Sequence, residues 1–464
     1  MVYTACATWF QDWIDADPPT LEDEWDASEW IAQEMIPATH VFLHHAFHSI
    51  RARNDAVLIL RALYYEYYLF RAEIARASVP PVPDAPNRLQ TAPQTPQKSA
   101  AWHHESRDML SGHEFGSILT GAQAEYNSIV AKKCVPPADP DDYAAPDQVI
   151  VFLTPPEGLS PFKWGWRYEP IARDLFEMEF AGGVVYDGLG RMRHPSLPRL
   201  GASPDGLITT GPKVGRLVEL KCPISREPNG SVPVNYWIQM QLQAEVCDVP
   251  AVEYFEVALG SMLQTAAQDD AFEQKARAAK LRWVGKVCVV ADHEDSPSNS
   301  YKYVYSPLFS TSDVGLAECQ AWNPHAEAGV ILESSLWWVK DYFTTTVLRN
   351  PRWWEAVGQP AYEQFWVDVT QARTDGRYNR VAVPLFVSDS DDETADMEMP
   401  QTAPDDAIGV DETPNDATDD DASSAVEGWQ GAESDHDSAM GIDVQFDSDS
   451  DLESEVQKSP ANTP

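Results

Sequence analysis

The chain has 464 residues, with 33 basic and 73 acidic side chains, and its formal net charge is −40. This length allows more than one domain and a large hydrophobic core. The six cysteines are scattered without a C-x-x-C pair, which disfavours a zinc or iron–sulfur site and predicts a reducing, intracellular compartment. The first twenty residues contain aspartates and lack a basic start, so we expect no signal peptide.

The N-terminal region, residues 1–78, is predicted to be helical. Three segments in it have helical patterns: Leu21–Met35, Thr39–Ile50 and Ala56–Phe70. The last is the most apolar, but it is too short to span a bilayer, so we interpret it as a buried helix and expect no membrane partner. Residues 79–100 are rich in proline and predict a linker or a long surface crossing before a second, larger domain at 101–375.

Two short motifs carry most of the chemistry. Asp205 lies in a Ser-Pro-Asp-Gly sequence, and Glu219, Leu220 and Lys221 begin a Glu-Leu-Lys-Cys-Pro sequence. In a strand, Glu219 and Lys221 project from one face while Leu220 enters the core. The turn signal at 209–212 predicts a β-hairpin that brings Asp205 to Glu219. Two carboxylates and an ammonium group suit Mg²⁺ and phosphodiester hydrolysis.

Flanking helices add polar groups to this constellation. Glu169 is predicted at a helix entrance, with Pro170 at the first helical position. The apolar stripe of that helix consists of Ile171, Leu175, Phe176 and Met178. Downstream, Tyr236, Gln239 and Gln243 share one face of a second predicted helix. Neutral amides and a phenol beside carboxylates can donate hydrogen bonds to water or phosphate.

The order of these motifs resembles the lambda-exonuclease family, which includes the YqaJ-like viral recombinases of the PD-(D/E)xK nuclease superfamily. Herpesvirus alkaline nucleases are more distant relatives of that group. The resemblance covers roughly Trp102–Val257. It implies an α/β fold, with a restriction-endonuclease-like core whose mixed central sheet is flanked by helices. It also implies Mg²⁺ as cofactor, with Mn²⁺ able to substitute.

The resemblance assigns roles to individual residues. The metal ligands would be the carboxylates of Asp205 and Glu219 and the backbone carbonyl of Leu220. Lys221 would be the catalytic lysine that activates or orients the attacking water. The remaining catalytic residues would be the helix glutamate, Glu169, and the glutamine, Gln239.

A fainter match concerns the end of the DNA. The family uses an arginine and a serine to bind the 5′-terminal phosphate; Arg107 fits the arginine, but His113 stands where serine is expected. Dependence on a 5′-phosphate is therefore left open. Arg216 and Tyr236 are further predicted contacts to DNA. Arg216 belongs to a predicted basic rim around the hairpin: Arg191, Arg193, Arg199, Lys213, Arg216, Lys221 and Arg226.

Beyond the core, the pattern predicts further strands at Val252–Val257, Arg282–Ala291 and Tyr301–Tyr305. Helices are predicted at Gly260–Lys280 and, with a serine cap, at Ser334–Phe343. The tryptophans of the C-terminal region favour packing of terminal helices over a stacking platform for single-stranded DNA.

The C-terminal segment, residues 376–464, has a different composition. From Ser388 onward it contains 24 acidic residues and one lysine, so this part supplies −23 of the net charge. Such composition predicts a disordered acidic tail. Its Ser-Asp clusters resemble acidic-directed kinase sites, which suggests a eukaryotic cell or its virus, with the nucleus or a viral replication site as the location.

Together these features predict a Mg²⁺-dependent exonuclease. It would degrade DNA from duplex ends, 5′→3′, and expose 3′ single strands for recombination, repair or viral genome processing. A single-strand annealing protein or recombinase would be its partner, and an oligomer is compatible with the family. Two alternatives remain open: an endonuclease or broad DNA/RNA nuclease of the same chemistry, and a catalytically weak DNA-binding scaffold that works through its acidic tail.

Overall fold

The computed structural model describes residues 2–16, 39, 42–43, 45–47, 49–97, 99–135, 153–265, 268–293, 301–325 and 329–378. The predicted helix at Leu21–Met35, most of that at Thr39–Ile50 and nearly all of the acidic tail lie outside these residues. Among the described segments, no helix is both long enough and apolar enough to cross a membrane.

Two N-terminal helices, α1 (Val2–Ala16) and α4 (Ile50–Ser78), pack on each other through an apolar cluster of their own. The hydroxyl of Ser49 caps α4 by accepting a hydrogen bond from the backbone of the first turn at 3.2 Å. The helix predicted at Ala56–Phe70 is confirmed as the middle of α4.

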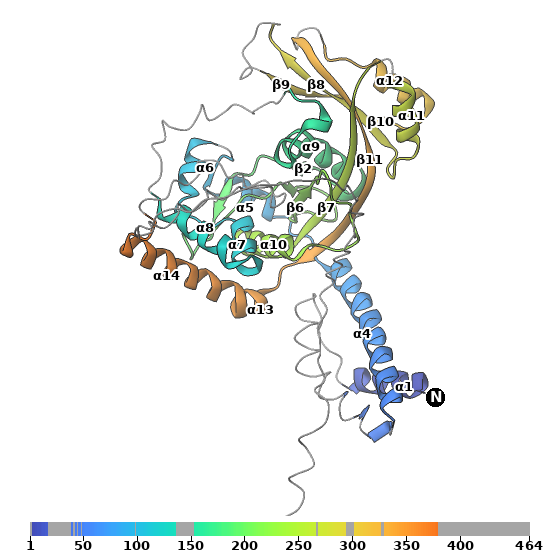
Figure 1. The fold of residues 1–464 in the computed structure, drawn as a ribbon, viewed down its shortest axis with the longest axis vertical. Coiled ribbons are helices and arrows are strands. Elements are labelled where there is room, and N and C mark those ends of the chain that lie inside the picture. Colours follow the sequence, from blue (N-terminus) through green and yellow to red (C-terminus); the bar gives the residue numbers. More distant parts are fainter. Residues whose placement is uncertain are drawn as a thin grey trace, which may run out of the picture. The chain divides into compact units, whose positions relative to one another are not determined.

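The centre of the described fold is a mixed sheet of eight strands, with the order β10-β8-β11-β7-β6-β5-β2 and with β9 paired to β8. The strands are β2 (Val185–Tyr186), β5 (Gly206–Ile208), β6 (Leu217–Lys221), β7 (Ala251–Leu263), β8 (Trp283–Ala291), β9 (Lys302–Tyr305), β10 (Phe309–Ser310) and β11 (Val330–Leu348). All pairs are antiparallel except β6 and β7. The predicted mixed α/β class is confirmed, and Figure 1 shows the long β7 and β11 side by side.

Helices cover both faces of this sheet next to β6. On one face lies α9 (Pro161–Phe176), which is followed by a short π-helical turn, η4 (Glu177–Ala181); on the other lies α10 (Val234–Cys247). The side chains of β6 alternate accordingly: Leu217 joins the α10 cluster, and Val218 and Leu220 join the α9 cluster. The alternation therefore turns Glu219 and Lys221 toward α10, as predicted.

A second, smaller sheet and several short helices precede and flank the hairpin. The sheet order is β1-β3-β4. These elements are α5 (Ala85–Thr91), β1 (Gln94–Thr95), α6 (Ala100–Glu105), α7 (Gly112–Thr120), α8 (Gln123–Cys134), the 3₁₀ turn η3 (Pro156–Gly158), β3 (Arg191–Arg193) and β4 (Gly201–Ala202).

The proline-rich stretch is part of this fold. Ala85 and Leu89 of α5 are buried in the same cluster as α10. The prediction of an extended linker from residue 79 was therefore wrong for this stretch. Proline is tolerated in the first turn of a helix, where its missing N–H has no intrahelical partner. The high proline content of this stretch is therefore compatible with a short helix that packs on the core.

The predicted serine-capped helix at Ser334–Phe343 is also wrong, because these residues lie in β11. Neighbouring strands explain the difference. Trp337 pairs with Gly285 and Trp338 pairs with Gly260, and a Cβ atom at either glycine would come within 2.6 Å or less of the indole ring. Glycines on both adjacent strands thus leave room for the two rings.

The remaining predictions downstream are mostly confirmed. Strands occur at the three predicted positions, as β7, β8 and β9. The helix predicted at 260–280 is shorter, as α11 (Asp269–Arg277), because β7 continues to Leu263. The other helices are α12 (Asp313–Ala321), α13 (Pro351–Trp353), the π-helical η7 (Trp354–Gly358) and α14 (Gln359–Asp375). Trp353, Trp354 and Trp366 are buried in the core cluster, which confirms the packing role.

Candidate active site

The β5–β6 hairpin brings the two predicted carboxylates together. Gly206 pairs with Val218 in antiparallel register, and Asp205 immediately precedes β5. The Asp205 carboxylate accepts a hydrogen bond from the backbone N–H of Leu220 at 2.8 Å. The predicted hairpin is therefore confirmed, and it holds the Asp205 side chain next to the Glu219–Lys221 strand.

Glu219 and Lys221 form a buried ion pair on the face toward α10. Lys221 Nζ lies 2.7 Å from Glu219 Oε1 and 4.6 Å from the centre of the Tyr236 ring. The Gln243 amide donates to Glu219 Oε2 at 2.6 Å. The structure thus gathers Asp205, Glu219, Lys221 and Tyr236, which the sequence singled out, into one cluster.

The glutamine that reaches the cluster is Gln243, one helical turn beyond the predicted Gln239. Gln239 lies against Gly112 of α7, where a Cβ atom would come within 2.7 Å of its side chain. Both glutamines share a face of α10, so their spacing was a visible signal. Only the depth of α10 against β6 decides which of them meets Glu219.

Glu169 occupies the middle of α9 rather than a helix entrance. The helix begins at Pro161, where the Ser160 hydroxyl accepts a hydrogen bond from Lys163 N at 3.4 Å. Pro170 lies inside the helix, so the prediction of a start at Pro170 was wrong. Ser160 as the N-cap and Pro161 in the first turn mark the real start of the helix.

The apolar stripe of α9 is confirmed in part. Ile171, Leu175 and Phe176 are buried, whereas Met178 is 57% exposed. Met178 falls in the π-helical turn η4. Backbone hydrogen bonds there join residues i and i+5, so successive side chains point in other directions than in an α-helix. The stripe thus ends where the α-helical period ends.

The electrostatics of the cluster show an excess of negative charge. Burial and the nearby carboxylates of Glu219 and Glu169 raise the pKa of Asp205 well above its usual value, although Lys221 and the Leu220 N–H act in the opposite direction. A bound cation would stabilise the ionised form of these groups. Carboxylate oxygens are also the ligands that Mg²⁺ prefers.

The residues present therefore fit a divalent metal. Asp205, Glu219 and the backbone carbonyl of Leu220 would hold it, and the Leu220 side chain is buried in the α9 cluster. Among the described residues, no group of three or more His, Cys, Asp or Glu side chains has the arrangement of a metal site. A site here would thus combine side-chain and backbone oxygens.

A second ion pair, between Arg226 and Glu256, lies beside Lys221 on the neighbouring strand. Lys221 is paired in register with Glu256 of β7. Glu256 accepts hydrogen bonds from Arg226 Nε at 2.9 Å and from the Tyr254 hydroxyl at 3.0 Å, and Arg226 lies 5.1 Å from the Tyr236 ring centre. The sequence did not indicate Glu256, because its ion-pair partner, Arg226, is 30 residues away in the chain.

Residues 101–250 match the family model of the YqaJ-like viral recombinase domain. This match covers 150 of the 464 residues, and we refer to residues 101–250 below as the YqaJ-like domain. Two crystal structures of LHK-Exo, an alkaline exonuclease from Laribacter hongkongensis, one of them in complex with dAMP, are similar at 13% and 14% identity, with TM-scores of 0.30 and 0.31. Each comparison covers 60% of this chain and 95% of the other. No curated protein matches the chain.

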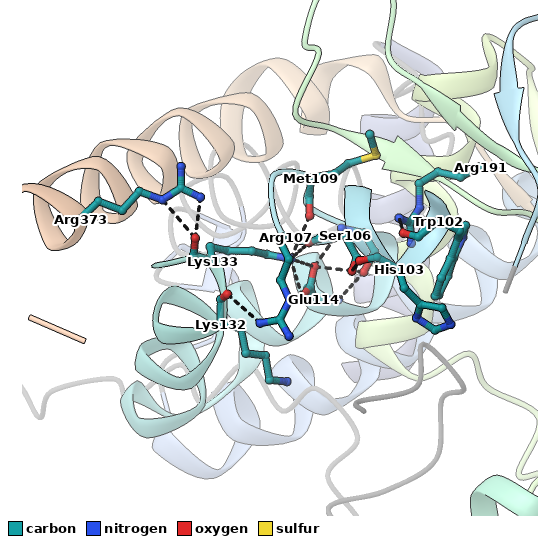
Figure 2. Close-up of polar contacts among 11 residues, drawn as sticks. Trp102, His103, Ser106, Arg107, Met109, Glu114, Lys132, Lys133, Arg191 and Arg373 are labelled. Carbon is teal, nitrogen blue, oxygen red and sulfur yellow. Dashed lines mark hydrogen bonds and ion pairs between the residues drawn. The ribbon is translucent and has the colours of Figure 1, made fainter. Parts of the chain in front are cut away.

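The start of the YqaJ-like domain holds the predicted phosphate contact Arg107. Its side chain is buried, with 8% exposed, and Nη1 donates to the carbonyl of Lys132 at 3.2 Å (Figure 2). His113 is half-buried in the first turn of α7, which begins after Ser111. Arg107 is thus held by α8 rather than lying on an exposed helix.

Lys133 organises this segment, as Figure 2 shows. Its ammonium lies 2.6 Å from the Glu114 carboxylate and donates to the carbonyls of Ser106 and Met109 at 2.6 and 2.9 Å. Glu114 in turn closes a capping box with Ser111 at the start of α7. Burial alone would raise the pKa of Glu114, but Lys133 and the Ser111 N–H outweigh it and lower that pKa.

Trp102 joins this segment to the Asp205 loop of the YqaJ-like domain. Its indole N–H donates to the Ser203 hydroxyl at 3.3 Å, and the Arg191 guanidinium lies 4.0 Å from the centre of its ring. Burial, followed by the charge of Arg191, lowers the pKa of His103 beside it. Motifs that are about a hundred residues apart in the chain therefore meet at one side of the hairpin.

The predicted basic rim is not an open band of charge. Every member contacts a carboxylate or an aromatic ring within the fold. Arg216 is the clearest correction: it is buried, and its guanidinium contacts Glu253 at 2.7 Å and the Val79 carbonyl at 2.9 Å. Lys213 shares Glu253 at 2.9 Å. These contacts place Arg216 in the packing of the domain, so it is not among the DNA contacts that we propose.

Proposed function

We propose that this protein is a metal-dependent DNA exonuclease. It would act on duplex ends in the 5′→3′ direction and expose 3′ single strands for recombination or viral genome processing. The observation that carries the proposal is the convergence of Asp205, Glu219 and Lys221 on one hairpin inside a YqaJ-like domain. A protein that anneals or recombines single strands would use the product.

The residues of the chain divide the work. Asp205, Glu219 and the Leu220 carbonyl would hold Mg²⁺, or Mn²⁺ in its place. Such a metal lowers the pKa of bound water and stabilises the negative charge that develops on the phosphate. Lys221, held at 2.7 Å from Glu219, orients the attacking water by hydrogen bonding. Glu169 adds a third carboxylate, and Gln243 fixes the orientation of Glu219.

The end of the DNA would meet the segment around Arg107. A guanidinium can form paired hydrogen bonds with a terminal phosphate, and the imidazole of His113, in the first turn of α7, can also hydrogen-bond to phosphate. Trp102 ties this segment to the Asp205 loop through Ser203. This contact supports the proposal that the segment reads the terminal phosphate of a strand in the active site.

The decisive experiment compares linear and covalently closed circular duplex DNA with and without Mg²⁺. We expect release of mononucleotides from linear DNA only, and only with the metal. Asp205→Asn serves as the inactive control. Efficient cutting of closed circles would favour an endonuclease of the same chemistry, and an absence of cleavage on both substrates would favour a binding scaffold.

End recognition is tested by comparing duplexes with a 5′-phosphate and a 5′-hydroxyl. We expect the phosphorylated end to be degraded faster than the hydroxyl end. Arg107→Ala should reduce the ratio of these two rates by about tenfold, which corresponds to one charged hydrogen-bond pair. Arg193→Ala is the matched control, because Arg193 is an exposed arginine paired with Glu105 at 2.8 Å. Equal rates on both ends would remove the phosphate-reading role.

A further inference from the structure

An open groove of about 460 Å³ lies on α14, and none of its lining residues belongs to the carboxylate cluster. Residues of α14 between Tyr362 and Thr374 line it, together with Arg199 of the loop between β3 and β4. Phe365 and Val369 of the same helix are fully buried in the core cluster. The groove therefore lies on the side of α14 that the described residues leave uncovered.

The groove favours an apolar partner. Val367 in its lining is 60% exposed, and the rings of Tyr362 and Trp366 also contribute to it. The polar side chains of α14 that line it already bond within the helix: Glu363 to Gln359, Thr370 to the Trp366 carbonyl, Gln371 to Asp375 and Thr374 to the Thr370 carbonyl. Covering Val367 with another apolar side chain would therefore remove apolar surface from water at little polar cost.

The chain supplies an apolar segment directly after α14. Residues 381–387 have the sequence Val-Ala-Val-Pro-Leu-Phe-Val and lie outside the described residues. Gly376, with a left-handed φ of 63°, ends the helix and turns the chain away from its axis. Tyr378 then packs against the core cluster that contains Tyr362 and Trp366. The chain thus lies against the same cluster three residues before the apolar segment begins.

Groove and segment also agree in length. From Tyr362 to Thr374 a helix rises about 18 Å. An extended chain from Val381 to Val387 spans about 20 Å, and the residues after Tyr378 reach about 10 Å more. The segment is therefore long enough to run back along the groove, antiparallel to α14.

Charge favours the same direction. The Arg199 guanidinium is exposed, lies beside Tyr362 and 4.7 Å from the centre of the Trp366 ring, and forms no ion pair among the described residues. A segment antiparallel to α14 brings the acidic residues after Val387 toward this end of the groove: Asp389, Asp391, Asp392 and Glu393. Complementary charge fixes the direction of binding more than its strength.

We propose that residues 381–387 occupy the α14 groove of their own chain and anchor the acidic tail beside Arg199. Because both partners belong to one chain, their effective concentration is high. The backbone N–H of Leu110 donates to the Arg199 carbonyl at 2.8 Å, which joins this loop to the segment that holds Arg107. The anchored tail would therefore compete with the DNA end at that segment, a consequence that rests on the proposed function, whereas the anchoring does not.

Melting of the full-length protein tests the anchoring without DNA or metal. Leu385→Ser combined with Phe386→Ser removes large apolar side chains from the segment and leaves the net charge unchanged. We expect this variant to melt about 2 °C below the unmodified protein. Val444→Ser combined with Phe446→Ser makes the same kind of change before the second Ser-Asp cluster and should not alter the melting temperature. Equal melting of the unmodified protein and the 385/386 variant overturns the proposal.

Val367→Gln tests the groove itself. Glutamine favours a helix more than valine does, so on a solvated face this change should leave the melting temperature unchanged or raise it. Under an apolar segment it should lower the melting temperature, and this loss should disappear in the 385/386 variant. An unchanged or higher melting temperature overturns the proposal, as does an equal loss in both backgrounds.

A peptide of residues 379–390 identifies the occupant. In calorimetry it should bind the full-length 385/386 variant, whose groove is vacated, at least tenfold more tightly than the unmodified protein. Equal affinity for the two proteins overturns the proposal. A dimer of the unmodified protein that the 385/386 variant does not form would overturn it in favour of a segment supplied by a second copy.

The affinity for 5′-phosphorylated duplex DNA, measured without Mg²⁺, tests the consequence for DNA. We expect the 385/386 variant to bind severalfold more tightly than the unmodified protein at low salt, where the tail's charge is least screened. Unchanged affinity would refute the competition with DNA and leave the anchoring standing. An unmodified protein and a variant that both fail to bind or cleave DNA would refute the proposed function instead.

Discussion

The domain contains two buried lysine–glutamate pairs of nearly equal geometry. Lys221 and Glu219 lie 2.7 Å apart in the hairpin, and Lys133 and Glu114 lie 2.6 Å apart between α7 and α8. Both ammonium groups are almost fully buried. The two pairs differ mainly in their surroundings. Comparing them therefore shows how neighbouring charges change the pKa values of the carboxylates.

Around Lys133 the charges and hydrogen bonds are balanced. The ammonium meets one carboxylate and two backbone carbonyls, and the pKa of Glu114 is lowered. Around Lys221 the carboxylates of Asp205 and Glu169 add negative charge, and the pKa of Asp205 is raised. A balanced buried pair stabilises a fold, whereas an excess of buried carboxylate favours the binding of a cation.

The largest expected effect is the loss of cleavage in Asp205→Asn. The amide keeps an oxygen for the Leu220 N–H but removes the charge that would bind metal. Loss of about 4 kcal/mol of transition-state stabilisation lowers the rate about a thousandfold. The measurement is mononucleotide release with Mg²⁺, and near-normal turnover would contradict the assignment.

Asp205→Asn also tests the comparison of the two pairs through the melting temperature of the protein. Because the raised pKa shows that ionised Asp205 is disfavoured in the fold, Asp205→Asn should unfold at the same temperature as the unmodified protein or higher in the absence of metal. Mg²⁺ should raise the melting temperature of the unmodified protein only. An equal shift in both proteins would place the metal elsewhere.

Lys221→Ala should reduce cleavage almost as strongly while DNA binding remains. The ammonium orients water in the proposed mechanism, and Lys221→Arg should not restore the rate, because a planar guanidinium is wider and does not release a proton. Cleavage rate and DNA affinity would be measured on the same preparations. A restored rate in the arginine variant would show that positive charge alone suffices.

In the Lys133–Glu114 pair, Lys133→Met should lower the free energy of unfolding. It leaves the Glu114 carboxylate and the carbonyls of Ser106 and Met109 without their ammonium partner. Breaking a buried pair from one side costs roughly 3 kcal/mol. Denaturant unfolding would measure this, and Glu114→Gln combined with Lys133→Met should recover part of the loss.

The pH dependence of that loss has a definite sign. The pKa of Glu114 is lowered in the fold, so the stability from its ionised form is present above the usual carboxylate pKa and is lost as the pH falls through the lowered value. The difference between the unmodified protein and Lys133→Met should therefore be largest at neutral pH and shrink in acid. A difference that is constant with pH would show that packing, not charge, accounts for it.

The smallest expected effect concerns charge outside both pairs. Residues 388–464 carry a net charge of −23, and a tethered polyanion competes with DNA. Deleting them should tighten DNA binding severalfold at low salt and less at high salt, where screening shortens the range of the interaction. The melting temperature should stay nearly unchanged. Identical affinities at both salt concentrations would end this hypothesis.

The hairpin was predictable because its signals are local. Strand alternation places Glu219 and Lys221 on one face, and a turn signal close by returns the chain to Asp205. The helix at Tyr236 was predictable from its period for the same reason. The roles of these residues in catalysis stay predictions until they are tested by substitution.

The site was less predictable where distant elements meet. The choice of Gln243 over Gln239 depends on how α10 lies on β6, and the burial of Arg216 depends on Glu253 in a strand 37 residues later. A cluster of basic residues in the sequence cannot show which of them a carboxylate elsewhere will neutralise. Partners of this kind are known only once the strands are in register.

The sequence by itself determined which carboxylates and lysine stand in the hairpin motifs, the order of the hairpin and its flanking helices, and the acidic composition of the C-terminal segment. The tertiary structure decided that 330–348 is a strand, because Gly285 and Gly260 on neighbouring strands make room for Trp337 and Trp338. It also decided which buried charges are balanced. Local patterns record the preferences of single elements, whereas burial and charge balance are properties of the contacts between them.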